Sequence, residues 1–285
     1  MIPLCTHARL VLAWLLIRNL ETAREQRAGF SWHLCCYSQS DLAVSKFFLA
    51  TKLLAGERVE PDDYWRTKHM FPIGDDDTQR RTFPIVTYAL IVLNVLFFLV
   101  ELNGGESFIM QWSLVPRRFM ANPAGDFATI FTSMFMHAGW VHLLGNMLYL
   151  WIFGDNVEDQ FGHAKFLIFY LLCGIAATFA QMIFNSGSSV PNLGASGAIA
   201  GVLGAYIILF PKGQVRVLMG RGIIPMPALV VIGLWIVLQL VSGIGSISQS
   251  ADTGGVAYLA HIGGFVAGIV LTFLFRTSSA RSATV

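Results

Sequence analysis

Long apolar runs fill the chain after residue 84 and limit what it can fold into. Six of them reach or approach the roughly 20 mostly apolar residues that a helix needs to cross about 30 Å of hydrocarbon. Lipid-exposed backbone must be hydrogen-bonded within its own segment, and the runs lack the alternation of barrel strands. The sequence therefore predicts an all-α, polytopic membrane protein with six transmembrane helices, at Pro84–Val100, Gly139–Phe153, Lys165–Phe184, Ser196–Phe210, Ile223–Val241 and Gly255–Phe275.

Composition excludes several other classes. Charged residues make up 13% of the 285 residues, against about a quarter in a typical soluble domain. A soluble enzyme, a disordered chain and a nucleic-acid binder are therefore disfavoured. The cysteines have neither zinc-site spacing nor a disulfide framework. We expect no metal and no cofactor. They are Cys5, Cys35, Cys36 and Cys173.

The predicted spans contain few polar groups and no deeply placed charge. A charge within a span is the usual mark of an ion-coupled or proton-coupled pathway, so a channel or transporter is disfavoured. The main polar residues of the spans are Asn94, His142, Asn146, Gln181, Ser196, Gln239 and His261.

The positions of Lys and Arg predict the orientation. We assume that the residues before the first span are cytoplasmic. The basic residues expected on the outer side are then Arg117 and Arg118, in the long loop Glu101–Ala138. Both termini are therefore expected in the cytoplasm. The basic residues on the cytoplasmic side are then Arg80, Arg81, Lys165, Lys212, Arg216, Arg221, Arg276 and Arg281.

Residues 1–69 differ from the rest of the chain. Their apolar run Leu10–Ile17 is too short to span a bilayer. Three interpretations stay open: a cytoplasmic extension of marginal order, an over-extended gene model with Met70 as the true start, or a targeting or regulatory domain. After residue 69 we expect a cytoplasmic segment at 70–83, a six-helix domain at 84–275 and a cytoplasmic tail at 276–285.

Two glycine-rich motifs carry candidate chemistry. Ser196 lies in Gly194-Ala195-Ser196-Gly197 at the start of the fourth span, and His261 lies in Ala260-His261-Ile262-Gly263-Gly264 in the sixth. Either motif alone is more typical of helix packing. Small residues spaced four apart let two backbones approach closely, which would bring a nucleophile near its base. The residues expected to pack in this way are Gly194, Gly197, Gly201, Gly264 and Gly268.

A third motif lies at the start of the second span. His142 and Asn146 are four residues apart and share a helix face. They lack a third metal ligand, whereas an asparagine donor suits developing negative charge. At 1.5 Å per residue, Asn146, His261 and Ser196 all fall roughly 8–9 Å below the outer boundary. This common depth links the three motifs.

Together the motifs resemble those of the rhomboid family of intramembrane serine proteases. The matching residues are Gly194–Gly197, Ala260–Gly264 and His142–Asn146, and Gly154–Asp159 is similar to the family's segment between the second and third spans. The resemblance covers Met70–Phe275.

The resemblance implies a Ser–His dyad with Ser196 as nucleophile and His261 as base. Asn146, His142 and the Ser196 backbone N–H would stabilise the oxyanion. The implied substrates are transmembrane segments of other membrane proteins, and the implied location is a bacterial inner membrane with the site open to the outer side. The alternative is a catalytically silent rhomboid-like protein that binds transmembrane helices for trafficking or quality control. The oligomeric state is not predicted.

Two positions depart from the family pattern. Ala128-Thr129 stand about where many members carry a Trp-Arg pair, so the outer loop must be anchored differently. Ala200 stands where some members have a tyrosine that stacks on the histidine. The group that orients His261 is therefore unidentified at this point.

Overall fold

A computed structural model describes residues 70–76, 78, 80–219, 222–247 and 257–275. The predicted segments 1–69 and 276–285 lie outside this range. The chain divides into two compact units, Pro72–Arg216 with Pro225–Val285 and Met1–Phe71 with Val217–Ile224. All the helices described below belong to the first unit.

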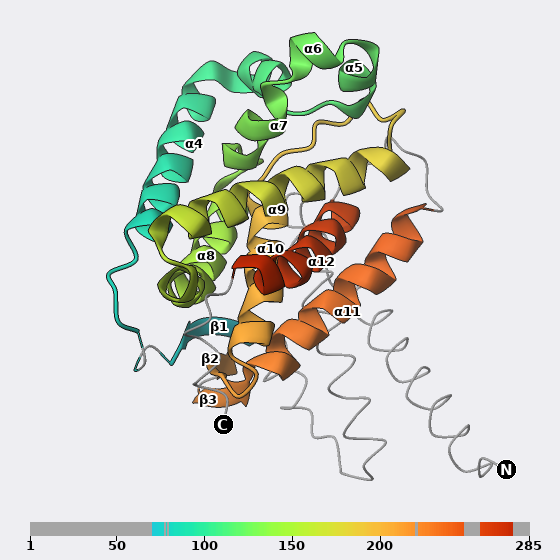
Figure 1. Ribbon diagram of the computed structural model, residues 1–285. Coiled ribbons are helices and arrows are strands. Elements are labelled where there is room, and N and C mark those ends of the chain that lie inside the picture. The colour runs from blue at the N-terminus through green and yellow to red at the C-terminus, as the bar shows by residue number, and fades with distance from the viewer. Residues whose placement is uncertain (1–69, 77, 79, 220–221, 248–256, 276–285) are drawn as a thin grey trace, which may run out of the picture. The chain divides into compact units, whose positions relative to one another are not determined.

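Helices occupy all six predicted apolar stretches (Figure 1). Three of them, α4, α9 and α12, are long and apolar enough to cross a membrane. The apolar parts of α10 and α11 are shorter, and α8 carries acidic residues in its last two turns. The mostly helical membrane fold is thus confirmed, while the count of six crossings stays a prediction. The bounds are α4 (Ile85–Trp112), α8 (Trp140–Phe161), α9 (His163–Phe184), α10 (Ser196–Leu209), α11 (Ala228–Ile247) and α12 (Tyr258–Phe275).

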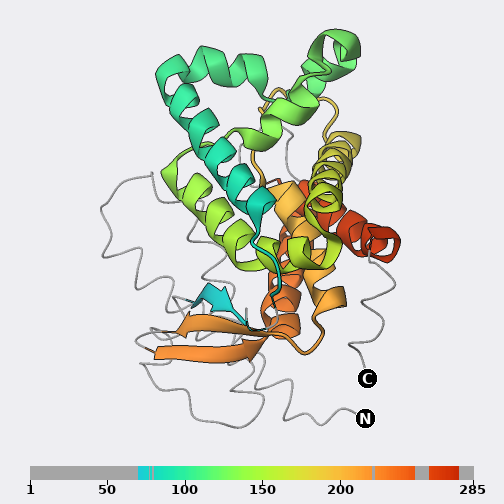
Figure 2. The ribbon, with the colours of Figure 1, turned by 60° about the vertical axis from the view of Figure 1, so that its left-hand side comes forward.

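The helix boundaries correct the sequence prediction in two places. The first apolar helix does not end at Val100. Helix α4 continues to Trp112 and changes direction at Gly105, whose φ is 62°. Figure 2 shows the two halves of α4 at a steep angle. The fifth helix begins at Ala228 rather than Ile223, because Pro225 and Pro227 interrupt helical hydrogen bonding.

A small sheet was not predicted. Strands β1 (Met70–Asp75), β2 (Gln214–Met219) and β3 (Gly222–Pro227) pair in the order β1-β2-β3. The available signal was the alternation of polar and apolar residues from Gln214 onward. The region before the first span and the connection before α11 are therefore extended rather than irregular.

The predicted outer loop folds into short helices. They are α5 (Pro116–Ala121), α6 (Pro123–Asp126), α7 (Thr129–Thr132) and the 3₁₀ turn η2 (Ser133–Phe135). Aromatic and apolar side chains of this region, including Phe119 and Ile130, are buried. The segment is therefore folded and packs its apolar side chains in the interior.

Helix α10 forms the centre of the first unit. Its residues from Gly197 to Tyr206 are buried, and it contacts α8, α9, α11 and α12. A Cβ on Gly264 would overlap the carbonyl oxygen of Gly197, and a Cβ on Gly268 would overlap that of Gly201. The backbones of α10 and α12 are thus in direct contact.

Carboxylates at one end of α8 hold the start of α4. The fully buried Glu158 accepts the backbone N–H groups of Val86 at 2.9 Å and Thr87 at 2.7 Å. The first N–H groups of a helix have no partner within it, and a carboxylate there also interacts favourably with the helix dipole. Glu158 therefore caps the start of α4.

The glycine contact generates a stability prediction. Gly268→Ala forces α10 and α12 apart, and overpacking of this kind costs about 1–3 kcal/mol. We expect a lower thermal unfolding temperature for the detergent-solubilised variant. The matched control is Gly233→Ala in α11, where a Cβ meets nothing within 4 Å. Equal stability of the two variants would contradict the backbone contact.

Candidate active site

Ser196 and His261 meet where α10 and α12 begin. Ser196 is the first residue of α10, and His261 lies in the first turn of α12. The Nε2 atom of His261 is 2.8 Å from Oγ of Ser196. His261 is buried, with 8% of its surface exposed, and Ser196 is partly exposed. The two helices thus bring a hydroxyl and an imidazole within hydrogen-bond distance.

The turn before Ser196 is tied to the region after α4. The Gly194 N–H donates to the Ser133 carbonyl at 2.8 Å, and Asn192 pairs with Leu114 through two backbone hydrogen bonds. Gly194 has a φ of 128°, which residues with a side chain rarely adopt. The position of Ser196 therefore depends on segment 113–133 as well as on α10.

Arg118 anchors that segment. Its Nε donates to Asp126 at 2.6 Å, its Nη2 donates to the Ser113 carbonyl at 2.8 Å, and its Nη1 donates to the Met110 carbonyl. One guanidinium thus joins α5, α6 and the end of α4. The segment that lacks a Trp-Arg pair at residues 128–129 is thus anchored by Arg118.

His142 and Asn146 lie four residues apart on α8 and so share a face of that helix. A Cβ on Gly194 would lie 2.9 Å from the His142 ring and 3.6 Å from Oγ of Ser196. The side chains of His142 and Ser196 therefore both border this glycine. Asn146 is buried, and its Nδ2 has no hydrogen-bond partner among the described residues. A buried amide donor without an acceptor is costly and is available to a ligand.

His137 backs the His142 ring. The two ring centroids are 5.2 Å apart, and the His137 backbone N–H donates to Glu101 at 2.9 Å. Burial, helped by the neighbouring His142, lowers the pKa of His137 to about 3. His137 is therefore neutral at physiological pH.

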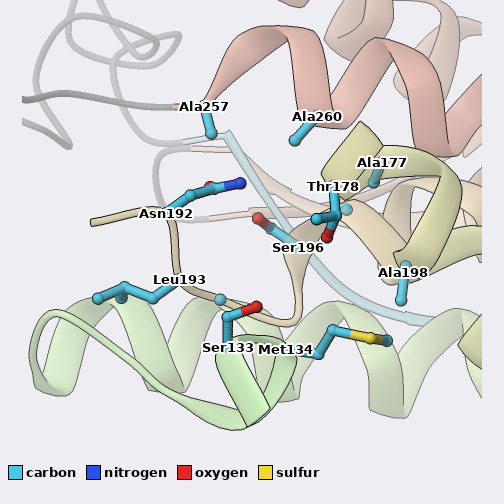
Figure 3. A pocket seen from close by; sticks show the side chains of 13 residues that line it. Ser133, Met134, Ala177, Thr178, Asn192, Leu193, Ser196, Ala198, Ala257 and Ala260 are labelled. Atoms are coloured by element: carbon cyan, nitrogen blue, oxygen red, sulfur yellow. The ribbon is translucent and has the colours of Figure 1, made fainter. Parts of the chain in front are cut away.

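A small cavity opens beside Ser196. Figure 3 shows Ser196 between Asn192 and Thr178, with side chains from η2, α9, α10 and α12 around it. The cavity has a volume of about 20 Å³, which is room for roughly one water molecule. The described residues contain no group of three or more His, Cys, Asp or Glu suited to a metal ion.

The second nitrogen of His261 has a partner that the sequence analysis did not identify. Nδ1 lies 2.7 Å from Oε1 of Gln239, and the ring of Trp235 lies 5.6 Å from the imidazole, tilted by 37°. Both residues come from α11. The available signal was an amide in an apolar helix with an aromatic residue one turn earlier on the same face.

These features define a helical integral membrane protein in which a serine and a histidine from two different helices meet. Residues 124–278 match the Rhomboid domain. The chain belongs to the rhomboid family.

Relatives occur in bacteria and in mitochondria. The chain is 34% identical over 191 residues to rhomboid protease GluP of Bacillus subtilis, covering 65% of this chain and 34% of GluP. It is 27% identical over 213 residues to mitochondrial rhomboid protein 1 of Saccharomyces cerevisiae, covering 73% and 58%. It is 33% identical over 106 residues to the mitochondrial presenilin-associated rhomboid-like protein of Bos taurus, covering 36% and 28%. Each match thus covers less than two thirds of the relative.

The Arg118 network generates a prediction about local stability. Arg118→Ala removes the bonds that join α5, α6 and α4, and hydrogen bonds from a charged group contribute about 1.5–3 kcal/mol each. We expect faster amide hydrogen exchange across residues 113–133. The matched control is Arg117→Ala, which removes one exposed side-chain hydrogen bond, to Gly187. Equal exchange in the two variants would argue against Arg118 as the anchor.

Proposed function

We propose that this chain is an intramembrane serine endopeptidase that cleaves transmembrane segments of other membrane proteins. The observation that carries the proposal is the 2.8 Å separation of His261 Nε2 and Ser196 Oγ. Rhomboid family membership and the name of GluP, a rhomboid protease, support the same reading.

In this mechanism Ser196 Oγ attacks the substrate carbonyl carbon while His261 Nε2 takes the hydroxyl proton. The tetrahedral intermediate collapses as His261 returns that proton to the leaving amine. Water then attacks the acyl-enzyme, again with His261 as base, and Ser196 is regenerated. The cavity beside Ser196 has room for about one water molecule.

Negative charge on the substrate oxygen would be stabilised by donors on two helices. Asn146 Nδ2 has no competing partner in the part of the chain that the structure describes, and His142 borders the same glycine as Ser196. The Ser196 backbone N–H lies in the first turn of α10, where N–H groups lack helical partners and the dipole is positive. Such preorganised donors are a major source of rate enhancement.

A substrate helix must unwind before its peptide carbonyl can be attacked, because a helical carbonyl is already hydrogen-bonded. Helix-weakening residues such as glycine, with small side chains near the cleaved bond, are therefore expected in substrates. The basic residues favour a membrane orientation with both termini in the cytoplasm and the site open to the outer side. We propose a bacterial inner membrane as the location.

The dyad is tested with a fluorophosphonate probe, which labels activated serines. We expect labelling of the detergent-solubilised wild type and of Ser107→Ala, an exposed serine on α4, but none of Ser196→Ala or His261→Ala. If the folded wild type stays unlabelled in detergent and in liposomes, a helix-binding protein without catalysis becomes the better reading.

The oxyanion role of Asn146 has its own test. Removing one such donor typically lowers the rate about 100- to 1000-fold, so Asn146→Ala should fold normally and cleave a transmembrane substrate slowly. The matched control is Asn103→Ala, which removes an exposed amide from α4. Wild-type cleavage by folded Asn146→Ala would show that the amide does not act on the oxyanion.

A further inference from the structure

We propose that Gln239 is a positioning residue for His261. Its side-chain carbonyl accepts a hydrogen bond from the Nδ1–H group, which leaves Nε2 unprotonated and able to take the proton of Ser196. The proposal rests on the proposed function, because it assigns the orientation of that proposed base. It fills the place left open by Ala200, where some family members have a tyrosine against the histidine.

The hydrogen bonds determine which nitrogen carries the proton. Oε1 of Gln239, 2.7 Å from Nδ1, can only accept. Nδ1 must therefore carry the hydrogen, and a neutral imidazole then has its lone pair on Nε2. That atom lies 2.8 Å from Ser196 Oγ. One amide thus selects the tautomer in which the ring can act as base toward Ser196.

Trp235 restricts the ring as well. It lies one helical turn before Gln239 on α11, so the two side chains share a face of that helix. Its ring is 5.6 Å from the imidazole and tilted by 37°. An aromatic surface on one side and a hydrogen bond at Nδ1 together limit rotation of the His261 ring.

The choice of an amide suits the surroundings. Gln239 is 6% exposed within an apolar helix, where an unpaired amide would be costly and a charged carboxylate more so. When His261 takes the Ser196 proton, the Gln239 carbonyl dipole faces the new positive charge. An amide can therefore stabilise the imidazolium without a buried counter-ion.

The supporting helix is a third one. Ser196 belongs to α10 and His261 to α12, whereas Gln239 and Trp235 belong to α11, which packs beside α12 (Figure 1). Gly243, one turn beyond Gln239, lies close to Ile262 and Tyr258 of α12. The dyad therefore requires α11 to be docked on α12 in this register.

The first test compares fluorophosphonate labelling rates. Gln239→Leu keeps the side-chain bulk and removes the acceptor. A hydrogen bond to a charged group corresponds to about a 10- to 100-fold change in rate, so labelling should slow by that factor. The matched control is Asn94→Leu, which removes a buried amide on α4 and should label like the wild type.

The second test does not depend on activity. In ¹⁵N NMR of histidine-labelled protein in liposomes, with His261→Ala used for assignment, the wild type should show His261 protonated on Nδ1. Gln239→Leu should show a mixture of tautomers. A purely structural role for Gln239 would change the unfolding temperature and leave the tautomer alone.

The outcomes separate this proposal from the proposed function. Wild-type labelling of folded Gln239→Leu would overturn the positioning role. A wild-type His261 protonated on Nε2 would overturn it even if a variant failed to fold. An unlabelled wild type would count against the protease proposal alone, since the NMR result still decides the role of Gln239.

Discussion

Backbone contact between α10 and α12 is the constraint on which the rest of the site depends. The helices touch where glycine faces glycine, at Gly197 with Gly264 and at Gly201 with Gly268. In a bilayer, helix association relies on this close packing, because lipid tails are as apolar as the side chains they would replace. A hydrogen bond between side chains tolerates only a few tenths of an ångström. Any residue that separates the two backbones would therefore also separate the serine and the histidine.

Polar interactions hold α10 at both ends while its middle is apolar. At one end the preceding turn is tied to Ser133 through the Gly194 N–H. At the other end the Tyr206 hydroxyl donates to the buried Asp75 at 2.7 Å, and Asn156 of α8 donates to the same carboxylate. Buried carboxylates are stable only when their oxygens are well bonded. The buried carboxylates of Asp75 and Glu158 thus lie where helices are joined to one another.

Hydropathy predicted the helices, because an apolar run is a local pattern. The meeting of Ser196 with His261 is a long-range contact that was predicted from the small residues of both motifs and their common depth. The strand pairing of residues 70–75 with 214–219 was missed, since it joins segments far apart in the chain. The role of Gln239 was also missed, although the residue stands out as a polar side chain in an apolar span. Its contact with His261 depends on the rotation and depth of α11, and apolar composition specifies neither.

The order of the motifs along the chain has a consequence for synthesis. The histidine lies 65 residues after the serine, on the last helix that the structure describes. The same helix supplies the glycine surface against which α10 packs. A nascent chain that already contains Ser196 therefore lacks the contact between Ser196 and His261 until α12 has been made and packed. If Ser196 is the nucleophile proposed above, late insertion of His261 leaves it without its base until the helices have assembled.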